Sequence, residues 1–101
     1  MQLIKDEKYQ KREMKFFKRH QNLIGKYEEV LKILKENHTD KSLRLHPLKG
    51  KLQGFHSVRL TYEYRIVLIL IIEKNQIVLV DIGTHDAVYQ YQLKYDFWDK
   101  L

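Results

Sequence analysis

One apolar segment restricts the fold of this chain more than any other part of it. Residues 64–72 are apolar apart from Arg65, and the uninterrupted run from Ile66 to Ile72 has seven residues. A helix that crosses a bilayer needs about 20 such residues, so this run is far too short to span a membrane. Its Ile and Val content, and its apolar residues on both faces, are typical of a central strand that is covered on both sides. We therefore expect a sheet with this segment at its centre.

Shorter extended segments flank the central one. Residues 55–61 precede it, and residues 77–82 follow it after Glu73-Lys74-Asn75-Gln76, which has a common length for a hairpin loop. On the other side, Tyr62 and Glu63 can form a tight turn. The three strands are predicted to form an antiparallel meander.

The first half of the chain has the periodicity of helices instead. A basic segment with Tyr9, Phe16 and Phe17 predicts a shorter helix that packs through its aromatic side. A second helix follows, with Asn22 as a candidate N-cap, and His38-Thr39-Asp40 interrupts the pattern before the strands begin. The apolar positions of the second helix recur at the spacing of one helical face: Leu23, Ile24, Tyr27, Val30, Leu31 and Leu34.

Together these segments predict a single α+β domain over residues 1–101, with an N-terminal strand and two helices packed on one face of an antiparallel sheet. The chain has no cysteine, which excludes thiolate zinc sites, thiol nucleophiles and disulfides and is compatible with a reducing cytosol. No two histidines have the i, i+4 spacing of a helical metal site, and no Gly-rich phosphate loop is present. The N-terminus turns charged at Lys5, without the apolar stretch of a signal peptide. We expect a cytoplasmic protein without a metal site.

Positive charge is concentrated in one quarter of the chain. Between Lys41 and Arg65, six Lys or Arg residues stand against one acid, Glu63, so this segment carries +5 of the net charge of +6. Such a patch attracts phosphate groups by Coulomb force and counterion release, and binding that rests on it should weaken steeply with salt. Nucleic acid is therefore the first candidate ligand.

Short motifs lie in and after this basic segment. In order they are His46-Pro47-Leu48-Lys49-Gly50, Gly54-Phe55, Val58-Arg59-Leu60, Tyr64-Arg65-Ile66, and Gly83-Thr84-His85 with Tyr89 four residues further on. Each is short, but their combination, order and spacing resemble the RelE/ParE toxin superfamily, and within it the YafQ-like endoribonucleases. The resemblance covers about residues 1–89.

The remaining residues, 90–101, are interpreted as a C-terminal extension of that core. From Tyr89 to Phe97, aromatic or apolar residues alternate with polar ones, which favours a strand. Tyr91, Tyr95 and Trp98 also fit one face of a helix. The strand is the preferred interpretation because unbroken alternation over nine residues is harder to produce by chance.

The resemblance implies a RelE-like microfold, in which a helical pair lies across a twisted antiparallel sheet. It also implies the toxin of a bacterial type II toxin-antitoxin system that cuts ribosome-bound messenger RNA without a metal or organic cofactor. RNA supplies its own nucleophile, the 2′-hydroxyl, so the protein must accept that proton, stabilise the phosphorane and protonate the departing 5′-oxygen. The implied products are a 2′,3′-cyclic phosphate and a 5′-hydroxyl. The implied partners are a cognate antitoxin, messenger RNA and the ribosome, with no membrane.

Matches to the family motifs imply the roles of individual residues. His85 is the candidate general acid, and His46 is a candidate proton acceptor or phosphate ligand, since an unperturbed imidazole titrates near pH 6.5. Arg65 is expected to hold the scissile phosphate. We expect all three to converge on a solvent-accessible hollow that admits one phosphodiester.

Further residues are assigned to RNA binding by the same resemblance. Lys49 and Lys51 are expected to hold the RNA backbone, and Arg59 to bind phosphate. Tyr89 stands at the family's aromatic position, where it can stack on a base or orient the phosphate. Each lysine also fits an ordinary solvated loop charge.

The chain departs from the YafQ-like pattern at two positions. Arg59 stands where those enzymes carry a further histidine, and Glu63 where they carry an aspartate. A guanidinium cannot act as a base at neutral pH, so either His46 or Glu63 must accept the proton. His56 can replace the missing histidine only if its side chain points into the hollow where His46, Arg65 and His85 are expected to converge.

Two other functions are compatible with the same fold, because function depends on the site and not on the fold. One is a ParE-like toxin that inhibits DNA gyrase through protein contacts. The other is a basic RNA-binding module, which would need Lys49, Lys51 and Arg65 but neither imidazole. The effect of replacing His85 on message cleavage distinguishes these alternatives from the nuclease.

Overall fold

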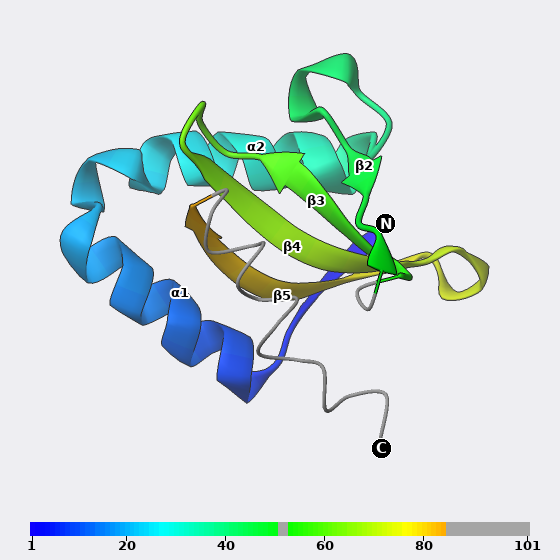
Figure 1. The fold of residues 1–101 in the computed structure, drawn as a ribbon, viewed down its shortest axis with the longest axis horizontal. Helices are drawn as coiled ribbons and strands as arrows, with labels where there is room; N and C mark the ends of the chain where they lie inside the picture. Colours follow the sequence, from blue (N-terminus) through cyan, green and yellow to red (C-terminus); the bar gives the residue numbers. More distant parts are fainter. Residues whose placement is uncertain (51–52, 85–101) are drawn as a thin grey trace.

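In the computed structural model of the chain, residues 1–50 and 53–84 are described. Figure 1 shows two helices that follow one another in an arc around a central sheet. The helices are α1 (Glu7–Arg19) and α2 (Ile24–Glu36), and the strands are β1 (Gln2–Lys5), β2 (His46–Pro47), β3 (Phe55–Arg59), β4 (Tyr64–Ile71) and β5 (Gln76–Thr84). The 3₁₀ turns η1 (Gln21–Leu23), η2 (Lys41–Leu43) and η4 (Ile72–Lys74) lie between them. The predicted strand over residues 89–97 lies outside the described residues.

The sheet has five strands in the order β1-β5-β4-β3-β2. Strands β3, β4 and β5 form the predicted antiparallel meander, and β2 adds to it antiparallel to β3. At the opposite edge β1 runs parallel to β5, so the sheet is mixed and not wholly antiparallel as expected. The reason is that α1 and α2 separate β1 from the rest, and a helical crossover allows a parallel neighbour that a short turn does not.

Strand β4 lies at the centre because it can bury both faces. Ile66 and Leu68 point toward the helices and have no exposed surface, whereas Val67 points the other way and is only 1% exposed. The prediction of a two-sided apolar strand is thus confirmed. The helix-facing side joins one core with α1 and α2: Tyr9, Tyr27, Val30, Leu34, Leu43, Val58, Leu60, Ile66, Leu68, Ile77, Leu79 and Ile82.

A β-bulge in β5 connects the sheet to α1. Val67 lies opposite Asp81 and Leu68 opposite Leu79, so Val80 is the extra residue of the bulge. Arg12 of α1 donates a hydrogen bond from Nη1 to the carbonyl oxygen of Val80 at 2.8 Å. Since a bulge disrupts the regular ladder, this bond gives α1 a fixed place on the sheet.

The helix boundaries follow local capping. The Asp6 carboxylate accepts a hydrogen bond from the Tyr9 backbone N–H at 2.8 Å and begins α1. The prediction that Asn22 caps the second helix is wrong, because residues 21–23 already form η1 and α2 begins at Ile24 without a side-chain cap. Both helices have 13 residues, so the first is not the shorter. In the described part of the chain, no helix is long and apolar enough to cross a membrane.

The predicted break after the second helix is confirmed. Helix α2 ends at Glu36, and the Asp40 carboxylate then accepts a hydrogen bond from the Ser42 N–H at 2.9 Å. This bond begins η2, and its C-cap residue Arg44 leads the chain into β2.

Candidate nucleic-acid interface

Strands β2, β3 and β4 bring three of the predicted site residues to one face of the sheet. His46 lies opposite Ser57, and Arg59 lies opposite Arg65. Because side chains alternate along a strand, Ser57 and Arg59 point away from Val58, which is buried against the helices. His46, Arg59 and Arg65 therefore lie on the face opposite α1 and α2.

The His46 ring is held between two hydrogen bonds. Its Nδ1 lies 3.2 Å from the carbonyl oxygen of Arg44, and its Nε2 lies 3.2 Å from Oγ of Ser57. A carbonyl only accepts, so Nδ1 carries the hydrogen, and the neutral ring accepts at Nε2 from the Ser57 hydroxyl. Ser57 is fully buried and His46 half-buried. The ring is thus fixed in orientation while one side remains accessible.

Arg59 and Arg65 form a pair of like charges directly across two strands. Side chains at such positions have Cβ atoms about 4.5–5.5 Å apart, and like charges there repel each other. Arg59 also lies over the Tyr62 ring, with its guanidinium carbon 5.6 Å from the ring centroid. Two half-buried guanidinium groups on neighbouring strands can bind adjacent phosphates of one RNA chain, whose charges would offset their repulsion.

His56 points to the wrong side to take part in this site. It lies opposite Leu68 and Pro47, in the row that faces the helices, so it cannot replace the missing family histidine. Its Nδ1 is buried and makes no hydrogen bond within the described residues. Burial lowers the pKa of His56 below its usual value of 6.5, and the neighbouring His46 and His38 add to this effect. The neutral ring is therefore the form that the fold favours.

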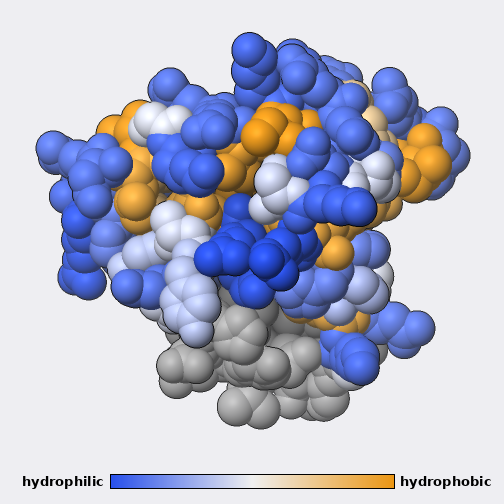
Figure 2. All heavy atoms as spheres, turned by 90° about the horizontal axis from the view of Figure 1, so that it is seen from above, coloured by the Kyte–Doolittle hydropathy of each residue, from blue (hydrophilic) through white to orange (hydrophobic). Residues whose placement is uncertain are grey.

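The other described candidates lie at the margin of this face. Glu63 is exposed in the turn between β3 and β4, where its N–H donates to Oγ1 of Thr61 at 3.2 Å. Lys49 is exposed in the loop after β2. Seen from the side of α2 and β2, Figure 2 shows strongly hydrophilic residues gathered in the middle of the surface, beside separate apolar patches. Within residues 1–50 and 53–84, no three His, Asp or Glu residues are grouped to hold a metal ion.

Comparison with known proteins places this fold in a family. A family model described as bacterial toxin of type II toxin-antitoxin system, YafQ, matches residues 2–90. The chain belongs to the YafQ toxin family. None of the curated protein sequences compared with this YafQ-family toxin matches it.

Solved structures share the fold of this YafQ-family toxin at low sequence identity. YafQ from E. coli strain BL21(DE3) is 15% identical with a TM-score of 0.71, over 86% of this chain and 96% of that one. A YoeB/ParE toxin from Agrobacterium tumefaciens is 21% identical with a TM-score of 0.68, over 84% of this chain and 99% of that one. The E. coli DinJ-YafQ toxin-antitoxin complex matches at 18% identity and a TM-score of 0.69, over 86% and 94%.

Three residues that the motifs nominate for this YafQ-family toxin, Lys51, His85 and Tyr89, lie outside the described residues. Gly83, which is two residues before His85 in the sequence, lies opposite Arg65.

Sequence reasoning missed Ser57 and Arg44, the two residues that hold His46. Neither belongs to a recognised motif. Their contacts depend on the register between β2 and β3 and on the turn after η2, which no local pattern indicates.

Proposed function

We propose that this YafQ-family toxin is an endoribonuclease that cleaves messenger RNA, in the cytoplasm and on the ribosome, without a metal or organic cofactor. The observation that supports the proposal best is the placement of His46, Arg59 and Arg65 on one face of three neighbouring strands, opposite α1 and α2. An imidazole beside two guanidinium groups suits a phosphodiester, because one group can transfer protons while the others neutralise charge that develops on the phosphate.

In the proposed reaction, the 2′-oxygen of the substrate attacks the adjacent phosphorus and loses its proton to a base. The P–O5′ bond then breaks, and His85 gives a proton to the departing oxygen, which leaves a 2′,3′-cyclic phosphate and a 5′-hydroxyl. His46 and Glu63 are both candidates for the base. When the His46 ring is neutral and its Nδ1 donates to the Arg44 carbonyl, Nε2 is free to accept a proton, and Glu63 is exposed in the adjacent turn.

Binding of the RNA is assigned to the cations around this face. Arg59 and Arg65 hold the scissile phosphate and the one next to it, while Lys49 and Lys51 contact the backbone on the side of the β2 loop. Tyr89 stacks on a base or orients the phosphate. Affinity should depend strongly on salt, since each neutralised phosphate releases condensed counterions.

We also propose that a cognate antitoxin silences the protein. Relatives of this chain are described in complexes with antitoxins, as DinJ-YafQ from E. coli and YoeB-YefM from Staphylococcus aureus. For this chain, with its net charge of +6, an acidic segment that covers the basic face would be electrostatically complementary. Its binding would also raise the stability of the toxin by mass action.

The substitution His85→Ala tests the proposal. We expect it to abolish both growth arrest and message cleavage, with a loss in rate of about 100-fold or more, because the leaving oxygen would lack its acid. Binding to RNA or ribosomes should persist. The measurement is growth of cells that express the variant without antitoxin, combined with mapping of message ends.

Two outcomes would support other functions. If the His85→Ala variant still arrests growth and message stays intact, a ParE-like toxin that acts on gyrase through protein contacts is favoured. If neither the wild type nor the variant cuts message although both bind RNA, the protein is a basic RNA-binding module.

A further inference from the structure

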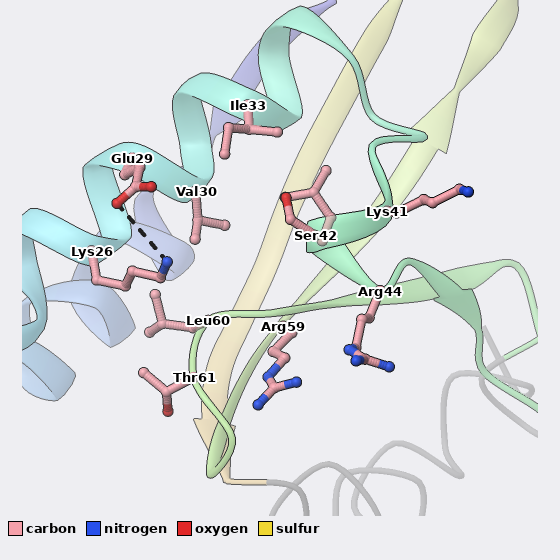
Figure 3. A pocket seen from close by; sticks show the side chains of 11 residues that line it. Lys26, Glu29, Val30, Ile33, Lys41, Ser42, Arg44, Arg59, Leu60 and Thr61 are labelled. Carbon is pink, nitrogen blue, oxygen red and sulfur yellow. Dashed lines mark ion pairs between the residues drawn. The ribbon is translucent and has the colours of Figure 1, made fainter.

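A hollow lies between α2, η2 and the turn that joins β3 to β4. Its volume is about 640 Å³. Figure 3 shows Arg44 and Arg59 extending from η2 and β3 toward the same side, while Lys26 turns to Glu29 across the opening. Arg59 lines this hollow and also lies opposite Arg65, so the hollow and the candidate interface share this residue.

The charge of this hollow is strongly positive. Lys26, Lys41, Arg44 and Arg59 are among its lining residues. Glu29 is the acidic residue in the described lining, and its carboxylate lies 3.9 Å from Nζ of Lys26. Glu29 therefore offsets the lysine on α2, and the side formed by η2 and β3 keeps its full positive charge. This side suits an anion.

The apolar lining residues differ in exposure. Leu43 and Leu60 are each 1% exposed and Val30 is 4% exposed, because all three belong to the core, whereas Ile33 is half-buried. Four of the lining residues are Lys or Arg, with Glu29 as the acid among them. This charge favours a polyanion as the ligand.

Arg44 lines the hollow and also contacts His46 of the candidate interface through its backbone. Its φ of 48° and ψ of 46° place it in the left-handed region, which L side chains rarely adopt and which concentrates at functional sites. This conformation ends η2 and lets the Arg44 carbonyl accept a hydrogen bond from Nδ1 of His46 at 3.2 Å. The same residue thus orients His46 with its carbonyl and lines the hollow with its guanidinium group.

Tyr62 adds a flat aromatic surface beside Arg59, which lines the hollow. It is 87% exposed, which is unusual for so large an apolar ring, and it lies against the Arg59 guanidinium at 5.6 Å. Proteins that bind single-stranded nucleic acids use an exposed aromatic ring for base stacking and a neighbouring cation for phosphate contact.

We propose that Arg44, Arg59 and Tyr62 form a second RNA subsite, which binds the nucleotide next to the scissile phosphate. The guanidinium groups of Arg44 and Arg59 hold its phosphate, and its base stacks on Tyr62. This subsite rests on the proposed nuclease function, since it places the RNA chain across the face that carries His46 and Arg65.

The test compares Arg44→Asn and Tyr62→Ala with a matched control, Lys32→Gln. Asparagine tolerates the left-handed conformation, so Arg44→Asn removes the guanidinium and keeps the carbonyl that orients His46. Lys32 is exposed on α2, outside the described lining of the hollow, and its replacement changes the net charge by the same amount. The probes are a single-stranded RNA oligonucleotide, measured by fluorescence anisotropy, and message on translating ribosomes, measured by cleavage kinetics.

We expect Arg44→Asn and Tyr62→Ala each to raise the Kd for the oligonucleotide and the KM for message about 10-fold, with kcat changed less. Arg44→Asn should also reduce the slope of log affinity against log salt by about 0.7, the value for one lost phosphate contact on a single strand. Tyr62→Ala should leave this slope unchanged, and Tyr62→Phe should bind like the wild type because it keeps the ring.

Affinity and KM equal to those of Lys32→Gln in both variants would overturn the subsite, whether or not His85→Ala abolishes cleavage. Loss of RNA affinity in both variants, with message cleavage intact in His85→Ala, would overturn the proposed mechanism and leave the subsite standing. Normal RNA affinity, together with escape from neutralisation by the antitoxin in growth assays, would show that the hollow binds an acidic protein segment and would also overturn the RNA assignment.

Discussion

His46 and His56, the two histidines in the described strands, differ in the hydrogen bonds that their rings make. His46 has hydrogen-bond partners at both nitrogens, from the Arg44 carbonyl and the Ser57 hydroxyl. His56, one residue before Ser57, lies in the row that faces the helices and has a buried Nδ1 without a hydrogen bond in the described structure. The sequence alone does not distinguish these two histidines, but the pleat of β3 places them on opposite faces of the sheet. Of the two, His46 lies on the face opposite the helices.

His56 makes stability depend on pH in a predictable direction. Burial lowers the pKa of His56 in the folded chain, whereas the unfolded chain has the usual value of 6.5. Between the lowered value and pH 6.5, the unfolded chain therefore binds a proton that the folded chain does not bind. The contribution of His56 to stability is therefore complete above about pH 6.5 and is lost as pH falls toward the lowered value. Replacing His56 with Leu should remove this part of the pH dependence.

Thermal unfolding between pH 5 and pH 8 measures the effect. The difference in Tm between His56→Leu and the wild type should move in favour of the variant as pH falls. A difference that stays constant over this range would show that His56 does not titrate differently in the folded chain.

The candidate site residues were predicted from short sequence motifs, and these motifs identify only part of the candidate site. His46, Arg59 and Arg65 were nominated from the sequence and lie on one face. Ser57 and Arg44 were not, because their contacts with His46 arise from strand register and from a left-handed backbone. Such contacts join residues through the fold, and neither residue type signals them.

At the scale of elements, a chain of hydroxyl groups joins α1 to α2. Tyr27 donates to the Glu13 carboxylate, which also accepts from Nζ of Lys5 at 2.6 Å. The hydroxyl oxygens of Tyr9 and Tyr27 are 2.6 Å apart, and since the Tyr27 hydrogen goes to Glu13, Tyr9 is the donor. Burial raises the pKa of both phenols well above 10.0, so both remain donors at every physiological pH.

This order of donors predicts unequal effects of two similar substitutions. Tyr27→Phe leaves the fully buried Tyr9 hydroxyl without an acceptor and should destabilise the fold by about 1–3 kcal/mol. Tyr9→Phe removes only the end of the chain and should cost about 0.5–1.5 kcal/mol. Urea unfolding measures both, with the exposed Tyr62→Phe as the matched control, for which no change is expected. Equal losses for the two buried tyrosines would contradict the assigned direction.

Helices and strands could be predicted from the sequence where the pattern that indicates them lies within one segment. The two-sided apolar strand and the meander around it were predicted because alternation and turn residues are local. The start of α2 was not, because a 3₁₀ turn occupies the position where a cap was expected. The parallel pairing of β1 with β5 was not predicted either, since the partner of a four-residue strand depends on where two helices return the chain.

At the scale of the whole molecule, the architecture separates the helix-packed core from the candidate site. The helices and the core occupy one side of the sheet, while the opposite face of β2, β3 and β4 carries His46, Arg59 and Arg65. The hollow in Figure 3 shares Arg59 with this face. Of the cations between residues 41 and 65, Arg59 and Arg65 lie on this face, and Lys41, Arg44 and Arg59 line the hollow.

The central claim is that this surface cleaves RNA by using the 2′-hydroxyl of the substrate. The most direct test is a message with a single 2′-deoxynucleotide on the 5′ side of a mapped cleavage position, incubated with translating ribosomes and the purified toxin. We predict that the unmodified message is cut to a 2′,3′-cyclic phosphate and a 5′-hydroxyl, and that the modified message is not cut at that position. Equal cleavage of both messages would contradict the account.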